Sequence, residues 1–313
     1  MSYVFIHLNV LFSPYCNNLP LVKTNIYMKK LILTVPCLLA AFFSIAQAPV
    51  EKSLLWKIEG NGLSQASYLY GTIHIMCPDD INISDKLLSA FSGTEQLYLE
   101  LDLDDPNTML KMMTGMMMND GGSLKTLLPE KDYDSVSTIF QKKTGMPLNM
   151  LNNAKPILLM SMVYPSLLGC TPQGWEQAIM KMAKEKDMEV FGLEKVEEQI
   201  SVLDSIPYEV QADMFLKTMY NLDSAKLSFD KMVEVYKKQD IQEMINMTSS
   251  DEDFGEYEEV MLKNRNHNWI PVIEKAMHEK PTFFAVGAAH LGGDIGVINL
   301  LRKQGFKVTA VKY

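Results

Sequence analysis

Long apolar segments are scarce in this chain of 313 residues, and the most apolar run extends only from Leu31 to Ile45. A membrane-spanning helix needs about 20 apolar residues, so this run is too short for one. Basic residues are also in the minority, with 29 lysines and arginines against 38 acidic residues and a net charge of −9. A surface of that sign repels nucleic acid and anionic lipid, so we expect neither as a partner.

The chain also lacks a Pro- or Ser-rich linker and any repeat of fixed period. Its 47% hydrophobic and 21% charged content is that of an ordinary globular protein, which argues against disorder. We therefore expect residues 47–313 to form a single domain.

The first 46 residues have the layout of an export signal behind an upstream extension. Met28 is a possible second start, Lys29 and Lys30 supply a basic region, and Ala46 ends a small-x-small cleavage pattern after the apolar run. We expect the protein to start at Met28 and to be cleaved after Ala46. The alternative to this start is that residues 1–27 belong to an extended N-terminal region of the signal. The protein would then be periplasmic or secreted by a bacterium, touching the membrane only through an uncleaved signal.

Cleavage would change the net charge to −12, because the removed segment carries three lysines and no acid. Cysteine is rare, and two of the four, Cys16 and Cys37, would leave with the signal. An oxidising compartment could join the remaining Cys77 and Cys170. Two buried free thiols are the alternative, since the sequence does not show the Cα separation that a disulfide requires.

Apolar patterns predict strands near both ends of the expected domain. The segments LLWKIEG (54–60) and SYLYGTIHI (67–75) flank a turn at Asn61-Gly62, which predicts a β-hairpin. Alternation predicts a strand in QLYLELDL (96–103), and MEVFGL (188–193) predicts another. The chain should end as strand, helix and strand over 282–311.

Helical spacing dominates between these strands, over 84–91, 107–182, 207–247 and 253–277. Together the patterns predict an α/β (α+β mixed) fold. A central mixed sheet would be flanked by helices, with a long helical insertion between the strand that precedes His74 and the strand that precedes His290. The Met-rich stretch MLKMMTGMMMND (109–120) is interpreted as a helix that uses methionine for packing, with thioether binding of a soft metal ion as the alternative.

Two distant segments share the pattern of an apolar strand followed by Gly-x-x-His, at Gly71–His74 and Gly287–His290. Glycine at a strand end permits a positive φ or a close backbone approach, and neutral imidazole is the commonest metal ligand. His267 and His278 lie in polar and charged runs, so we expect them on the surface.

Two acidic residues are ambiguous from their patterns alone. In QLYLELDL, alternation puts Glu100 on the polar face with Tyr98 and Asp102, where it could bind metal, act as a base or simply face water. Glu194 precedes a helix, and the helix dipole favours an acidic residue there whether or not that residue takes part in catalysis.

The motifs LLWKIEG…YLYGTIH, LYLELD, FGLEKVEEQI, Arg265-Asn266 and FFAVGAAHLGGDIGVINLLRKQGFKVTAV resemble the TraB/GumN family, which includes the TIKI metalloproteases. The likeness covers essentially the whole expected domain. It implies a site in which His74, His290 and Glu100 bind a divalent metal, Mn²⁺, Co²⁺ or Zn²⁺, and in which Glu100, Glu194 and Arg265 are catalytic residues.

The function expected from this resemblance is that of an exported metal-dependent hydrolase, most simply a peptidase, with a peptide or protein as substrate. Glu194 would orient or deprotonate the attacking water, and Arg265 would stabilise the oxyanion. Fold-level likeness does not establish catalysis, so a non-catalytic protein that binds metal, haem or peptide is the alternative.

Overall fold

The computed structural model describes residues 51–251 and 254–313 of the chain. The expected extension, export signal and cleavage site at residues 1–46 lie outside the described residues. In the described part, no helix is both long and apolar enough to cross a membrane.

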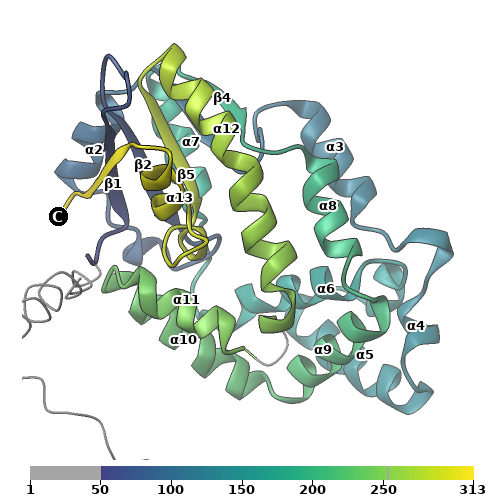
Figure 1. Ribbon diagram of the computed structural model, residues 1–313. Helices are drawn as coiled ribbons and strands as arrows, with labels where there is room; N and C mark the ends of the chain where they lie inside the picture. The colour runs from purple at the N-terminus through teal and green to yellow at the C-terminus, as the bar shows by residue number, and fades with distance from the viewer. Residues whose placement is uncertain (1–50, 252–253) are drawn as a thin grey trace, which may run out of the picture. The chain divides into compact units, whose positions relative to one another are not determined.

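A six-stranded sheet forms the centre of the fold, in the order β4-β3-β5-β2-β1-β6 (Figure 1). Strands β2, β3, β4 and β5 run parallel, whereas β1 is antiparallel to both β2 and β6. The predicted mixed sheet and opening hairpin are therefore confirmed. The strands are β1 (Leu55–Glu59), β2 (Ser67–Thr72), β3 (Gln96–Leu99), β4 (Glu189–Gly192), β5 (Thr282–Gly287) and β6 (Lys307–Ala310).

Helices cover both faces of this sheet. On one face, the ring of Phe91 in α2 (Asp85–Ser92) lies 5.1 Å from that of Phe283, and Trp175 of α7 (Trp175–Glu185) lies 5.0 Å from Tyr70. On the other, α12 (Asn264–Glu279) runs alongside the strands (Figure 1), and Arg302 of α13 (Val297–Lys303) stacks on Trp56 of β1. The sheet is thus buried as the predicted fold class requires.

The predicted helical insertion is present in two parts, between β3 and β4 and between β4 and β5. Several of its helices enclose a second apolar core, which contains Phe140, Leu159 and Phe215. The remaining helices are α3 (Pro106–Gly115), α4 (Leu124–Leu127), α5 (Glu130–Thr144), α6 (Pro156–Val163), α8 (Val196–Asp204), α9 (Tyr208–Tyr220), α10 (Leu222–Lys237) and α11 (Ile241–Ser249), with a π-helix at Glu259–Lys263 before α12.

Two strands are shorter than the patterns predict. Strand β2 ends at Thr72 and β3 ends at Leu99, so His74 and Glu100 lie just beyond strand ends instead of within strands. The final strand–helix–strand unit consists of β5, α13 and β6. Its two strands are not neighbours, because β6 pairs with β1 and both β2 and β1 lie between β5 and β6.

The first part of the Met-rich stretch lies in α3, as predicted, but several of its methionines do not pack. Met109, Met113 and Met117 are 56%, 61% and 48% exposed, whereas Met118 is buried. The packing interpretation is therefore wrong for these three. Met109 and Met113 share one side of α3 at i and i+4, whereas Met117 lies beyond the helix in an isolated β-bridge with Ala154.

The four parallel strands end at one edge of the sheet, and each is followed by a residue that the sequence singles out. His74 follows β2, Glu100 follows β3, Glu194 follows β4 and His290 follows β5. Loops at the carboxyl ends of parallel strands are where ligands bind in open α/β sheets. The topology therefore collects the predicted residues at the edge expected of a functional site.

Candidate functional site

Arg265, in the first turn of α12, is the centre of a buried cluster at this edge. Its Nη2 atom donates to Glu100 Oε2 at 2.5 Å and to Glu194 Oε1 at 2.7 Å, and its Nε atom donates to Glu194 Oε2 at 3.0 Å. Its Nη1 atom lies 3.1 Å from His290 Nε2. Four of the five predicted residues thus meet around a single guanidinium.

Glu100 is held from two sides. Its Oε1 atom accepts a hydrogen bond from the backbone N–H of Gly287 at 2.8 Å, and Oε2 faces Arg265. Burial raises the pKa of this carboxyl, but Arg265, the two histidines and the backbone N–H of Gly287 together outweigh burial and keep that pKa well below its usual range. Glu100 is therefore a buried carboxylate anion, and the alternative of a side chain that merely faces water is wrong.

Glu194 is bound entirely by protein donors. Besides Arg265, it accepts hydrogen bonds from Trp269 Nε1 at 3.1 Å and from Gln199 Nε2 at 3.1 Å, and its side chain is only 5% exposed. The indole of Trp269 also lies under the guanidinium, 4.9 Å from it. These contacts fix Arg265 in place, because a bidentate carboxylate and an aromatic face restrain a guanidinium in both position and plane.

The tautomer of His290 follows from its neighbours. Asn266 Nδ2 donates to the carbonyl oxygen of Ile295 at 2.9 Å, which turns Asn266 Oδ1 toward His290 Nδ1 at 2.6 Å. His290 Nδ1 must then carry the proton, leaving Nε2 to accept from Arg265. Burial lowers the pKa of His290 to about 3, so the ring is neutral at physiological pH.

His74 lies outside this buried cluster but within range of its charges. Its side chain is 69% exposed, and its charge contributes to the lowered pKa of Glu100. Nδ1 lies 3.0 Å from Oε1 of Glu176, which also accepts from the hydroxyl of Thr72 at 2.9 Å. The bond to Glu176 raises the pKa of His74 to about 9.

The glycines of both Gly-x-x-His segments serve close approach rather than a positive φ. A Cβ on Gly71 would lie 2.6 Å from Leu291 Cδ1 and 3.0 Å from Ala288 Cβ, in the segment that carries His290. A Cβ on Gly287 would lie 3.3 Å from Glu100 Oε1. Neither glycine is among the residues with positive φ, so of the two predicted explanations the close approach is confirmed.

The donor chemistry of these residues suits a divalent metal ion. Ligand atoms lie about 2.0–2.2 Å from such an ion, so two of them can share it when they are up to about 4 Å apart. His290 Nε2 and Glu100 Oε1 are 4.0 Å apart. Each histidine also has its Nδ1 next to an oxygen acceptor, the usual support of a metal-binding imidazole.

The third ligand of the expected metal site, His74, is not grouped with His290 and Glu100. Within residues 51–251 and 254–313, no group of three or more histidine, cysteine and acidic side chains is arranged to hold a metal ion. Arg265 instead faces His290 Nε2 and Glu100 Oε2. An ion bound by His290 and Glu100 would have to replace Arg265 Nη1 at His290.

Several residues that bond the predicted site residues were not themselves predicted from sequence patterns. Gln199, Trp269 and Glu176 each bond a predicted residue. They come from helices α7, α8 and α12, and helical spacing does not distinguish them from core or surface positions. Asn266 and Gln199 lie in motifs of the family resemblance, Arg265-Asn266 and FGLEKVEEQI, and these motifs were the one signal for them.

The other candidate ligands lie elsewhere. His267 and His278 are exposed, as predicted. Cys77 is joined to Cys170 by a disulfide, so it offers no thiolate, and the open choice between a bridge and two thiols is decided in favour of the bridge.

Comparisons with known proteins identify the family of this chain. The model of the TraB/PrgY/gumN family matches residues 54–310. Metalloprotease TIKI2 of Danio rerio is 24% identical over 346 aligned residues, which cover 86% of this chain and 66% of that protein. Metalloprotease TIKI1 of Homo sapiens is 23% identical, over 82% of this chain and 61% of its own length.

A shorter match, 35% identical over 82 residues, is to the metalloprotease TIKI homolog of Nematostella vectensis and covers 16% of that protein. The chain thus matches only part of the length of each of these relatives. No solved structure matches it. Because the family model covers nearly all of the described fold, the chain belongs to the TraB/PrgY/gumN family.

Proposed function

We propose that this protein is an exported, metal-dependent hydrolase that cleaves peptides. The observation that carries the proposal is the meeting of His290, Glu100, Glu194 and Arg265 at the edge of the sheet where β2 also presents His74. The names of the TIKI relatives support a metalloprotease activity. The disulfide supports export, since such bonds persist in oxidising compartments.

In this proposal His74, His290 and Glu100 hold the divalent ion, and their nitrogen and oxygen donors suit Mn²⁺, Co²⁺ or Zn²⁺. When bound, such an ion lowers the pKa of water and polarises a carbonyl group. The chain prepares both rings for the ion, because Asn266 and Glu176 engage the Nδ1 atoms and leave Nε2 as the binding atom.

Arg265 would stabilise the oxyanion that forms when water attacks the substrate carbonyl. Its fixed position favours this role, because a donor that is already oriented needs no rearrangement during the reaction. The role of base assigned to Glu194 stays a prediction. Its contacts with Arg265, Trp269 and Gln199 support a positioning role better, since these donors already engage both of its oxygens.

A cleft beside the cluster offers space for a substrate. It has a volume of about 630 Å³, lies between α8 and α12, and is lined by Glu194 and Arg265 together with Val202, Val260 and Val272. Binding sites of this size are common for small ligands, and their apolar walls with a few polar groups are typical. The valines would accept an apolar side chain of a peptide.

The experiment that tests the proposal measures metal content and cleavage of a peptide library by the purified protein supplied with Mn²⁺, Co²⁺ or Zn²⁺. His74→Ala and His290→Ala should lose both metal and cleavage, whereas His267→Ala, an exposed histidine of α12, should keep both. No cleavage in the presence of any of the three ions would contradict the hydrolase.

Metal binding without cleavage would favour the alternative, a non-catalytic protein that binds metal, haem or peptide. One observation favours that alternative: the bonds from Arg265, Trp269 and Gln199 leave no carboxylate oxygen of Glu194 unpaired. The same experiment therefore separates the two functions.

A further inference from the structure

We infer that Glu176 is the positioning residue of His74, fixing the ring with Nδ1 bonded and Nε2 free, and that the Cys77–Cys170 disulfide holds the two segments together for this purpose. The inference rests on the proposed function in taking His74 as a metal ligand. Glu176 is not among the residues that the sequence assigns to the site.

The contact is made by a side chain that is itself well held. Glu176 is in the first turn of α7, and its side chain is 18% exposed, against 69% for His74. Its Oε1 atom accepts from the hydroxyl of Thr72, which is 1% exposed, and lies 3.0 Å from His74 Nδ1. A largely buried carboxylate thus restrains a largely exposed ring.

The backbone brings α7 to the His74 loop. Met76 and Gln173 exchange two hydrogen bonds, at 3.0 and 2.9 Å, and Trp175 N–H donates to the carbonyl oxygen of Ile73 at 3.4 Å. Gly174 lies so close that a Cβ there would be 2.6 Å from the carbonyl oxygen of His74. The start of α7 is therefore fitted directly against the residue that Glu176 bonds.

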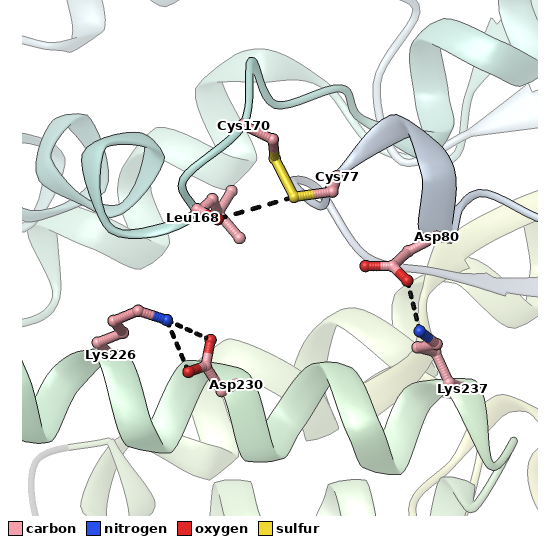
Figure 2. Close-up of a disulfide and its surroundings, with 7 residues drawn as sticks. All are labelled: Cys77, Asp80, Leu168, Cys170, Lys226, Asp230 and Lys237. Atoms are coloured by element: carbon pink, nitrogen blue, oxygen red, sulfur yellow. Dashed lines mark hydrogen bonds and ion pairs between the residues drawn. A yellow bond between two sulfur atoms is a disulfide. The ribbon is translucent and has the colours of Figure 1, made fainter.

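The disulfide closes the same junction from the far end of the loop. Cys77 lies three residues after His74, and Cys170 four residues before Gly174 (Figure 2). Asp80, just beyond Cys77, forms an ion pair with Lys237 of α10, which attaches the end of the loop to a second helix (Figure 2). The covalent bond and the backbone pair together leave the His74 loop little freedom relative to α7.

An acid in the first turn of a helix is also favoured by the helix dipole, whatever its contacts. That explanation predicts that Glu176 affects only stability. A positioning role predicts in addition that its loss changes which nitrogen of neutral His74 carries the proton. Partners of this kind fix the tautomer and orientation of a metal-binding imidazole, and their loss typically costs about 10–100-fold in metal affinity.

The test compares the wild-type protein with Glu176→Ala, with the conservative Glu176→Gln and with Glu185→Ala, which removes an exposed acid at the other end of α7. Nitrogen NMR of His74, recorded above its pKa of about 9 so that the ring is neutral and assigned with His74→Ala, reports the tautomer without any metal. Calorimetric titration with Mn²⁺ reports affinity. Circular dichroism confirms that each variant is folded.

We expect the proton on Nδ1 in the wild-type protein, in Glu185→Ala and largely in Glu176→Gln, which keeps an acceptor oxygen. In Glu176→Ala, the tautomer should shift toward Nε2–H, and affinity for Mn²⁺ should fall about 10–100-fold. An unchanged tautomer in Glu176→Ala, or an unchanged affinity where the wild-type protein binds Mn²⁺, would overturn the inference. A wild-type protein that binds none of Mn²⁺, Co²⁺ and Zn²⁺ would contradict the proposed function, while the tautomer would still decide the role of Glu176.

Discussion

Arg265 holds two buried carboxylates with a single positive charge. Glu100 and Glu194 both face its guanidinium, and their side chains are 11% and 5% exposed. Burying a charge is expensive unless it is paired, and removing one partner leaves that cost uncompensated. Arg265 is therefore as important for folding as for any chemistry at the site.

Replacing Arg265 by glutamine should destabilise the protein by about 3–5 kcal/mol, because two carboxylates are left facing each other without a cation. Urea unfolding measures the change. Adding Glu194→Gln should recover part of the loss, since only one buried carboxylate then lacks its partner. Lys263→Gln, two residues earlier and exposed, should change stability by less than about 0.5 kcal/mol. Equal effects of the two single substitutions would contradict this account.

A second ion pair lies in the helical insertion, where Lys155 Nζ, fully buried, is 2.8 Å from Asp204 Oδ1. Burial raises the pKa of Asp204, but the hydrogen bond and charge of Lys155 together with the hydrogen bond from Tyr208 outweigh burial, and the pKa is lowered. An unfolded aspartate titrates near about 3.9. The pair therefore stabilises the fold fully above about pH 4, and this contribution is lost as the pH falls through the lower folded-state pKa.

Asp204→Asn should consequently be less stable than the wild-type protein at pH 7, and the gap should shrink below about pH 4. Urea unfolding at a series of pH values tests this. A gap that stays constant down to pH 3 would mean that the carboxylate charge contributes nothing.

For single residues, the family resemblance predicted more than the sequence patterns alone could. Glu100 and Arg265 are 165 residues apart, and only the family resemblance indicated that they share a site. The engagement of Glu100 and His290 by Arg265, and the bond from Glu176 to His74, depend on side-chain directions that no periodicity records.

The strand ends decide where the site residues lie. Alternation predicted the strand at 96–103 and placed Glu100 on its polar face, but β3 ends at Leu99. The face on which alternation places Glu100 is covered by α12, where Gln96 bonds Ala276 and Glu100 bonds Arg265, so Glu100 meets the cluster instead of water. The patterns therefore located the strand but left the environment of Glu100 open, and only the family resemblance placed that residue in the site.

The Gly71 position tests how tightly two of these strand ends fit together. An added methyl group would meet Leu291 Cδ1 at 2.6 Å and Ala288 Cβ at 3.0 Å, both in the segment that carries His290. Gly71→Ala should destabilise the protein by about 1–3 kcal/mol through overpacking. Gly93→Ala is the matched control, because its nearest atoms lie at 3.5 Å, and thermal unfolding compares the two. Equal melting temperatures would show that this contact is loose.

The topology of the whole molecule brings distant parts of the chain to one sheet edge. The mixed sheet, its helical covers and the large insertion followed from the order of apolar patterns. Strand order did not follow, because the pairing of β6 with β1 depends on contacts between the two ends of the domain. The second apolar core was likewise unexpected, since helical spacing shows that a face is buried without showing against what.

The disulfide joins residues 93 positions apart, so its effect should extend to the whole fold. Closing a loop of that length restricts the unfolded chain, and typical disulfides contribute about 2–4 kcal/mol. The double variant Cys77→Ala/Cys170→Ala should lose about that much unfolding free energy. Reduction of the wild-type protein should cause a similar loss and leave the variant unchanged. A variant as stable as the oxidised protein would contradict the prediction.

The most direct test of a metal-dependent hydrolytic site at this sheet edge is the rate of peptide cleavage by Glu100→Gln beside the wild-type protein, both supplied with Mn²⁺. Glutamine keeps the size of the side chain and an acceptor for Gly287 N–H, but removes the charge that faces Arg265 and the expected ion. We predict cleavage by the wild-type protein and none by a folded Glu100→Gln variant. Cleavage at the wild-type rate by the variant would contradict the account.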